Sequence, residues 1–175
     1  VAIVVDSVSK RYSACGARIG WMATHRQDVF IEVLKLAQMR LSVPTIEQMA
    51  AVSLLDEVDQ DIQRAKEAYR SRRDVVCRLL EVAKIPCGYP KSALYIMADL
   101  GVDAEAFTEY MLTDYSGIST DRETVLTTPA ASFYCSSSDM GRTQIRIAFV
   151  VGEEALTRAM GHLIRGREEF LSVRG

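Results

Sequence analysis

Residues 1–21 read V-A-I-V-V-D-S-V-S-K-R-Y-S-A-C-G-A-R-I-G-W, and they decide how the rest of the chain is interpreted. The first five residues are apolar and mostly β-branched. This pattern is typical of a strand that is buried on both faces of a parallel sheet covered by helices. Such a strand needs neighbours that precede it in sequence. We therefore expect the chain to be a piece of a longer polypeptide whose earlier strands are missing.

A lysine follows this strand closely, and its surroundings are unusual. Ser7 precedes Lys10, Arg18 follows it, and Gly16 between them allows the chain to double back. The end of a strand in an open α/β sheet is a common ligand-binding position. A desolvated lysine amine near other cations is a nucleophile toward carbonyls, while a hydroxyl and a guanidinium suit a phosphate. The segment is therefore compatible with an aldehyde-bearing phosphate cofactor held through an imine.

Outward from this segment, the spacing of apolar residues predicts both strands and helices. The predicted strands cover residues 1–6, 18–23, 93–100, 124–128 and 144–151. The predicted helices cover residues 27–41, 45–55, 62–83, 103–112 and 153–171, and Asp103 is the expected N-cap of the fourth. Residues 129–142 are rich in Ser, Asp and Gly and are predicted to form a loop. The pattern predicts an α/β fold.

Composition excludes several classes of protein. The 175 residues are 49% apolar and 25% charged, with a formal net charge of −2, which argues against disorder and against a basic nucleic-acid-binding face. The sequence contains neither a run of 18 apolar residues nor a recognisable secretory signal, so we expect no membrane partner and a cytoplasmic location. The four cysteines form no C-x-x-C pair, and we expect reduced thiols without a metal site. His162 is expected at the surface or at an interface.

The run from Ser7 to Trp21 resembles the lysine motif of class I and II aminotransferases, which are fold-type I pyridoxal-phosphate enzymes. The family pattern is S-x-S-K followed, several residues later, by G-x-R-x-G. The resemblance implies that Lys10 forms a Schiff base with pyridoxal 5'-phosphate. It also implies that Ser7 and Arg18 bind the phosphate of the cofactor, and that Ser9 supports the same pocket.

Three later segments resemble the same family, in the same order along the chain: Y-R-S-R-R-D at 69–74, P-K-S-A-L-Y at 90–95 and Q-I-R-I-A-F at 144–149. The last implies that Arg146 binds the α-carboxylate of the substrate, and Tyr95 in the second is expected to pack in the core. The resemblance implies that residues 1–60 are the C-terminal remnant of the large cofactor-binding domain. Residues 61–175 would form the small domain, with a long bridging helix and other helices on a short mixed sheet.

The activity implied is transfer of an amino group between an amino acid and a 2-oxo acid by a homodimer. Aspartate or another acidic substrate is the default. The family's remaining cofactor-binding residues would lie before Val1, so we expect the fragment itself to be inactive and to hold little cofactor. Cys15 is expected to be an inert, small apolar residue.

Other readings of the lysine segment remain open. The chain could be a different fold-type I enzyme, such as a lyase or decarboxylase, or the aminotransferase-like ligand-sensing domain of a regulator. Residues 7–10 also fit the S-x-x-K pair of penicillin-binding proteins and class A β-lactamases. That class requires later S-D-N and K-T-G motifs, and the sequence contains neither.

Overall fold

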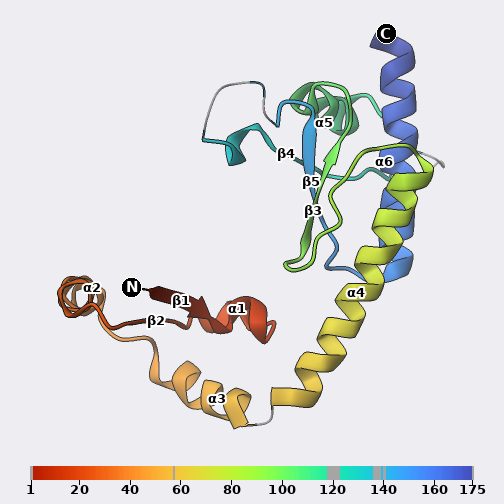
Figure 1. Cartoon of the computed structure of the whole chain (residues 1–175). Coiled ribbons are helices and arrows are strands. Elements are labelled where there is room, and N and C mark those ends of the chain that lie inside the picture. Colours follow the sequence, from red (N-terminus) through yellow and green to blue (C-terminus); the bar gives the residue numbers. More distant parts are fainter. Residues whose placement is uncertain (1, 57, 118–122, 136–138, 140, 175) are drawn as a thin grey trace. The chain divides into compact units, whose positions relative to one another are not determined.

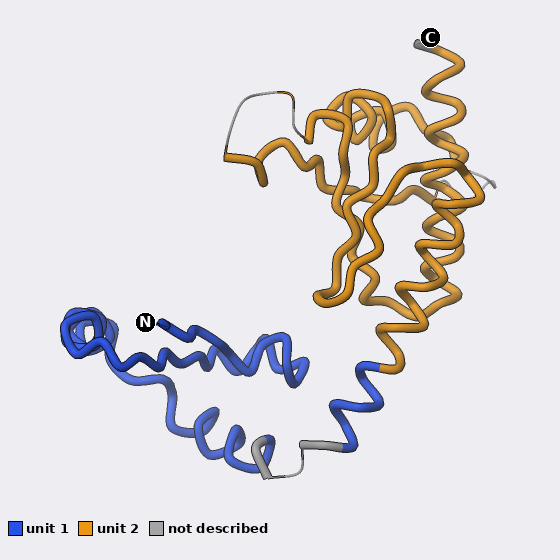
Figure 2. Tube along the Cα trace, viewed as in Figure 1, with its two compact units in different colours: residues 1–66 blue, residues 67–175 orange. Residues whose placement is uncertain are grey.

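The computed structural model describes residues 2–56, 58–117, 123–135, 139 and 141–174. The chain divides into two compact units, residues 1–66 and 67–175 (Figure 2). The elements of the first unit are β1 (Ile3–Ser7), α1 (Val8–Arg11), a 3-10 turn (Cys15–Ala17), β2 (Gly20–Thr24), α2 (Gln27–Met39) and α3 (Thr45–Asp56). The long helix α4 (Val58–Val82) begins in this unit and continues into the second (Figure 1).

The first strand forms where it was predicted, but its surroundings differ from the prediction. β1 pairs with β2 in an antiparallel, two-stranded sheet, with Ile3 opposite Thr24 and Ser7 opposite Gly20. The apolar residues Val4 and Val5 of β1 are 53% and 75% exposed. The expectation of a strand buried on both faces of a parallel sheet is therefore wrong for the described residues, because no further strand or helix covers it there.

The helices of the first unit also carry apolar side chains that remain exposed. Phe30 and Leu34 on α2 and Met49 on α3 are 42%, 42% and 70% exposed, and the described residues of this unit contribute only two buried apolar side chains. Exposed apolar surface of this extent is unusual in a soluble monomer and marks a candidate interaction surface. The core of the described chain therefore lies in the second unit.

The second unit is built on a three-stranded sheet in the order β3-β5-β4 (Figure 1). Its strands are β3 (Tyr95–Asp99), β4 (Thr128–Pro129) and β5 (Gln144–Ala148), accompanied by α5 (Ala104–Thr113), a 3-10 turn (Ala131–Phe133) and α6 (Glu153–Arg174). Both pairings in this sheet are antiparallel, not mixed as predicted. The overall class, α/β with a small domain of helices on a short sheet, is confirmed.

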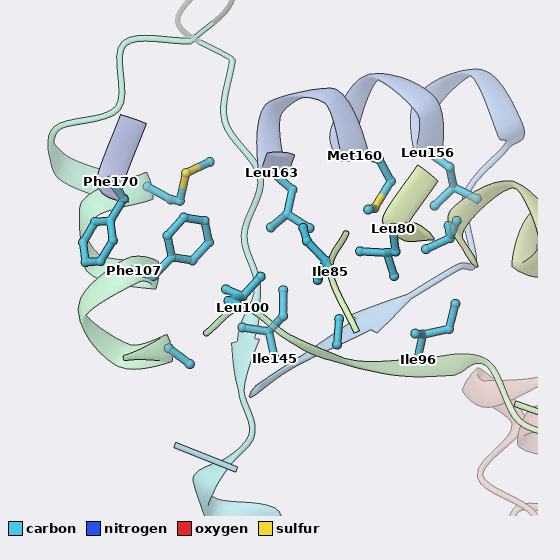
Figure 3. Close-up of a cluster of buried hydrophobic side chains, with 14 of the residues drawn as sticks. Leu80, Ile85, Ile96, Leu100, Phe107, Ile145, Leu156, Met160, Leu163 and Phe170 are labelled. Atoms are coloured by element: carbon cyan, nitrogen blue, oxygen red, sulfur yellow. The ribbon is translucent and has the colours of Figure 1, made fainter. Parts of the chain in front are cut away.

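One buried cluster joins the sheet to helices α4, α5 and α6. Strand residues alternate between faces, so Ile96 on β3 and Ile145 on β5 both point to the helical side and are at most 1% exposed. Figure 3 shows these side chains in one cluster with Leu80 of α4, Met160 of α6 and Phe107 of α5, all buried. The opposite face of β3 and β5 is left free of this core.

His162 of α6 is buried, which corrects the expectation of a surface or interface histidine. Only 6% of the residue is exposed, and its Nδ1 lies 3.1 Å from the hydroxyl of Tyr115. Its Nε2 lies 3.5 Å from a carboxylate oxygen of Glu123. A buried polar ring is tolerated when both nitrogens have partners, and here long-range contacts supply them.

Asp103 caps α5 as predicted, and its removal is expected to destabilise the second unit. Its carboxylate accepts a hydrogen bond from the amide of Ala106 at 3.0 Å and another from Arg142 at 2.9 Å. Asp103→Ala is expected to lower the free energy of unfolding by about 1 kcal/mol, whereas Asp103→Asn keeps the cap and should cost less. Thermal unfolding of the 175-residue chain measures both.

The same carboxylate predicts the sign of a pH effect. The Ala106 amide, followed by Arg142, lowers the pKa of Asp103 in the folded state. The stabilisation is therefore complete above the unfolded pKa of about 3.9 and is lost as the pH falls through the lower folded pKa. The wild type should lose more stability than Asp103→Asn below about pH 4, and equal losses would contradict this assignment.

Candidate functional site

The turn from β1 into α1 positions three of the predicted site residues. Ser7 ends β1, and its Oγ accepts a hydrogen bond from the amide of Ser9 at 3.3 Å, so that Ser7 caps the short helix. Val8 is only 2% exposed, and its amide donates to the carbonyl of Ile19 at 3.1 Å. This hydrogen bond holds the start of α1, the short helix that carries Lys10.

The return of the chain toward β1 includes left-handed residues at Ser13 and Arg18 and a closely approached glycine at position 20. Arg18 has a φ of +56°, a left-handed conformation that is uncommon for residues other than glycine. Strained residues of this kind cluster at ligand-binding sites. Gly20 lies opposite Ser7 in the ladder, and a Cβ there would lie 3.2 Å from the carbonyl oxygen of Asp6 and 3.5 Å from the Cβ of Ser7. The glycine lets β2 approach the serine closely.

Cys15 connects the residues that these turns bring together. Its thiol donates to the carbonyl of Ser9 at 3.1 Å, and the Nζ of Lys10 lies 3.6 Å from its sulfur. Its own carbonyl accepts a hydrogen bond from the Nη1 of Arg18 at 3.0 Å. Ser9, Lys10 and Arg18 thus share one partner. Cys15 was expected to be an inert apolar residue, but it is exposed and makes three polar contacts.

The chemistry of this donor set fits a phosphate-bearing aldehyde. The hydroxyls of Ser7 and Ser9 and the planar guanidinium of Arg18 are hydrogen-bond donors that suit a phosphate dianion. The Lys10 amine, which lies beside the sulfur of Cys15, belongs to a class of group that can react with a carbonyl. Lys10 is exposed, so the described residues do not provide the desolvation that was expected for it.

Arg146 is not part of this cluster and lies in the second unit, at the middle of β5. Its neighbour Ile145 is fully buried, so Arg146 points to the opposite face of the sheet, which the buried cluster of the described residues does not occupy and which is called the free face below. Its guanidinium carbon lies 4.5 Å from the ring centroid of Tyr95 and 4.6 Å from that of Phe133. In the described part of the chain, no carboxylate lies within ion-pair distance of it. A half-buried arginine held by rings and without an anion is suited to bind one from outside.

Two residues of this arrangement were not identified from the sequence as binding residues. Tyr95 was expected to pack in the core, but it is only partly buried and shares the free face with Arg146. Phe133 falls in the stretch predicted to be a loop, and 47% of it is exposed. The period-2 alternation of β3 would have placed Tyr95 on the face opposite Ile96, whereas no sequence signal links Phe133 to Arg146.

The described residues contain no group of three or more His, Cys, Asp or Glu side chains arranged to hold a metal ion. None of their helices has the length and apolar character needed to cross a membrane.

The sequence is similar to those of curated aminotransferases. An LL-diaminopimelate aminotransferase of Natranaerobius thermophilus is 28% identical over 162 residues, which cover 91% of this chain and 39% of that protein. An aspartate aminotransferase of Musicola paradisiaca is 29% identical over 175 residues, which cover 96% and 40% respectively. The chain therefore spans about 40% of the length of the curated relatives that it matches.

Solved structures show the same fold. One is an α-aminoadipate aminotransferase of Thermus thermophilus complexed with N-(5'-phosphopyridoxyl)-L-leucine. It has a TM-score of 0.82 at 21% sequence identity, and the match covers 98% of this chain and 43% of that chain. An aromatic aminotransferase of Pyrococcus horikoshii has a TM-score of 0.77 at 25% identity and covers 96% and 43%. The family model described as aminotransferase class I and II matches residues 1–163. The chain belongs to the class I and II aminotransferase family and matches its C-terminal portion.

Proposed function

We propose that this chain is the C-terminal part of a pyridoxal-phosphate-dependent aminotransferase that moves an amino group between an amino acid and a 2-oxo acid. The observation that carries the proposal is the cluster in which Cys15 contacts Ser9, Lys10 and Arg18, directly after the serine that caps α1. This cluster supplies both an amine and a phosphate-binding set in one turn of chain. Family membership supports the same chemistry.

Within this proposal the four candidate site residues of the first unit have distinct roles. Ser7, Ser9 and Arg18 would hold the phosphate of the cofactor. Pyridoxal phosphate would supply an electron sink for the negative charge that develops on the substrate Cα. The Nζ of Lys10 would hold the aldehyde carbon of the cofactor. As a free amine, Lys10 would take the proton from the substrate Cα and later return one, acting as general base and then as general acid.

Arg146 orients the substrate in the same proposal. Its planar fork can donate two parallel hydrogen bonds to the α-carboxylate, which fixes position as well as charge. A carboxylate held in this way limits rotation of the substrate about the guanidinium of Arg146. The free face on which Arg146 lies and its lack of an ion-pair partner in the described residues support this role.

We infer that residues 1–60 belong to the large cofactor-binding domain and residues 61–175 to the small domain. The exposed apolar side chains of β1 and α2 would then be covered by the rest of the large domain and by a second copy in a homodimer. An acidic amino acid remains the default substrate, and a cytoplasmic location remains the expected one.

The proposal is tested by transfer of a labelled amino group. The whole protein, containing this chain and the preceding part of the family's length, is supplied with pyridoxal phosphate, a ¹⁵N-labelled amino acid and a 2-oxo acid. We expect ¹⁵N in the amino acid formed from the 2-oxo acid, and none when the cofactor is omitted. A ligand sensor would instead bind the cofactor without transferring label, and such a result across a panel of substrates would overturn the proposal.

A further inference from the structure

Two aromatic rings reach Arg146 from opposite sides of its strand. β5 is the middle strand of the sheet, Tyr95 lies on β3 at one side, and Phe133 follows β4 at the other. Each ring centroid is within 4.6 Å of the guanidinium carbon. An unbranched arginine side chain has many rotamers, and contacts from both flanks restrict them. The rings therefore determine where the guanidinium lies on the free face.

The segment that carries Phe133 is itself held in place. The amide of Phe133 donates to the carbonyl of Ala130 at 3.0 Å, and Ala130 is fully buried. The hydroxyl of the next residue, Tyr134, donates to the Oε1 of Gln144 on β5 at 2.6 Å. Phe133 nevertheless stays 47% exposed. The hydrogen bonds of this segment therefore hold the Phe133 ring beside Arg146, although the ring is not part of the buried core.

Stacking and carboxylate binding use different parts of the same guanidinium. Aromatic rings contact its faces, whereas its N–H donors lie in its plane and point outward from its edge. A stacked arginine can therefore still donate two parallel hydrogen bonds to a carboxylate. It loses less conformational freedom when the carboxylate arrives, because the rings have already ordered it.

We propose that Tyr95 and Phe133 are the positioning residues of the carboxylate site, holding the Arg146 fork in the conformation that accepts a substrate carboxylate. This inference rests on the proposed function of Arg146. Neither ring donates to the carboxylate in this account, since both act through the arginine. The aromatic ring of Tyr95 matters and its hydroxyl does not.

The experiment uses the 175-residue chain and the probe pyruvate, a small 2-oxo acid. NMR reports the mobility of the Arg146 Nε–Hε bond and, by titration, the Kd for pyruvate. Phe133→Leu and Tyr95→Leu are each expected to increase that mobility and to weaken pyruvate binding by about twofold to fivefold. Tyr95→Phe, which keeps the ring, should behave as the wild type. Thermal unfolding of each variant identifies any effect on folding.

A matched control is available in the same unit. Tyr89 is also exposed and has the guanidinium of Arg73 over its ring at 4.2 Å, away from β5. Tyr89→Leu removes this ring contact, together with the hydrogen bond from the Tyr89 hydroxyl to Asp74, and should leave Arg146 and the pyruvate Kd unchanged. If it weakened binding as much as Phe133→Leu, general loss of structure would explain the effect and the inference would be overturned.

The outcomes separate this inference from the proposed function. Arg146→Gln is expected to abolish the titration. If it does, and both leucine variants keep the wild-type mobility and Kd, the rings have no positioning role and only the inference fails. If Arg146→Gln binds pyruvate as the wild type does, the carboxylate role of Arg146 itself is wrong. The mobility of the Nε–Hε bond is measured without ligand, so unchanged mobility in both leucine variants also contradicts the inference.

Discussion

Replacing Lys10 with arginine in the whole protein is expected to lower the rate of amino transfer by about 100-fold to 10,000-fold, the range that a positioned general acid or base contributes. Arginine keeps the positive charge beside Cys15 but does not lose its proton in proteins, so it can neither attack a carbonyl nor accept the Cα proton. Charge alone therefore cannot rescue the variant. The measurement is the turnover rate at saturating substrate.

Lys35 provides the matched control for this prediction. It lies on α2 in the same unit, is well exposed and pairs with Glu32 at 2.7 Å, so Lys35→Arg makes the same chemical change elsewhere. Borohydride reduction in the presence of pyridoxal phosphate should link the cofactor to the peptide that contains Lys10 and leave Lys35 unmodified. Wild-type turnover in Lys10→Arg, or modification of Lys35 in preference to Lys10, would refute the assignment.

The elements that the sequence predicts well are those fixed by local chemistry. Asp103 caps α5 because its acceptor and the Ala106 amide lie three residues apart. The apolar spacing of residues 62–83 predicts a helix face, and the alternation around Ile145 predicts a strand face. Both faces contribute buried side chains in the structure. Such signals depend only on neighbours in sequence, and the structure retains them because the tertiary contacts reinforce the same choice.

The sequence-based predictions are wrong where contacts between residues far apart in the chain determine strand length or burial. The strand predicted at 124–128 is a two-residue strand, Thr128–Pro129, because pairing with β5 extends only over those residues. His162 is buried because Tyr115, 47 residues away, supplies a partner for its ring. The composition of β1 predicts a doubly buried strand, whereas among the described residues it pairs with β2 and leaves Val4 and Val5 exposed.

The candidate site shows the same division. The cluster around Lys10 spans residues 7–20, and a turn of that length with a left-handed Arg18 brings its own ends together. The sequence predicts a shared site for Ser7, Lys10 and Arg18, and the structure shows Lys10 and Arg18 contacting Cys15, a contact that the sequence does not assign. Phe133 and Arg146 meet only through the pairing of β4 with β5 and the turn that follows β4, which no local pattern encodes.

The substrate carboxylate should matter to this protein only through Arg146. In the whole protein, Arg146→Gln is expected to lower kcat/KM for an amino acid by about 10-fold to 100-fold, as expected for the loss of a charge-assisted hydrogen-bonded pair. The same variant should leave kcat/KM unchanged for the corresponding amine that lacks the carboxylate. Comparing the two substrates isolates the interaction, because a general defect in folding or in cofactor binding would reduce both values together.

Arg142 supplies the matched arginine for this test. It lies four residues before Arg146, is exposed and pairs with Asp103 rather than with aromatic rings. Arg142→Gln should keep the wild-type preference for the amino acid over the amine. If Arg146→Gln also kept that preference, the carboxylate would have to be bound elsewhere, and the free face of the β3-β5-β4 sheet would lose its assigned role. If the preference collapsed in Arg146→Gln alone, the orientation of the substrate would depend on one guanidinium.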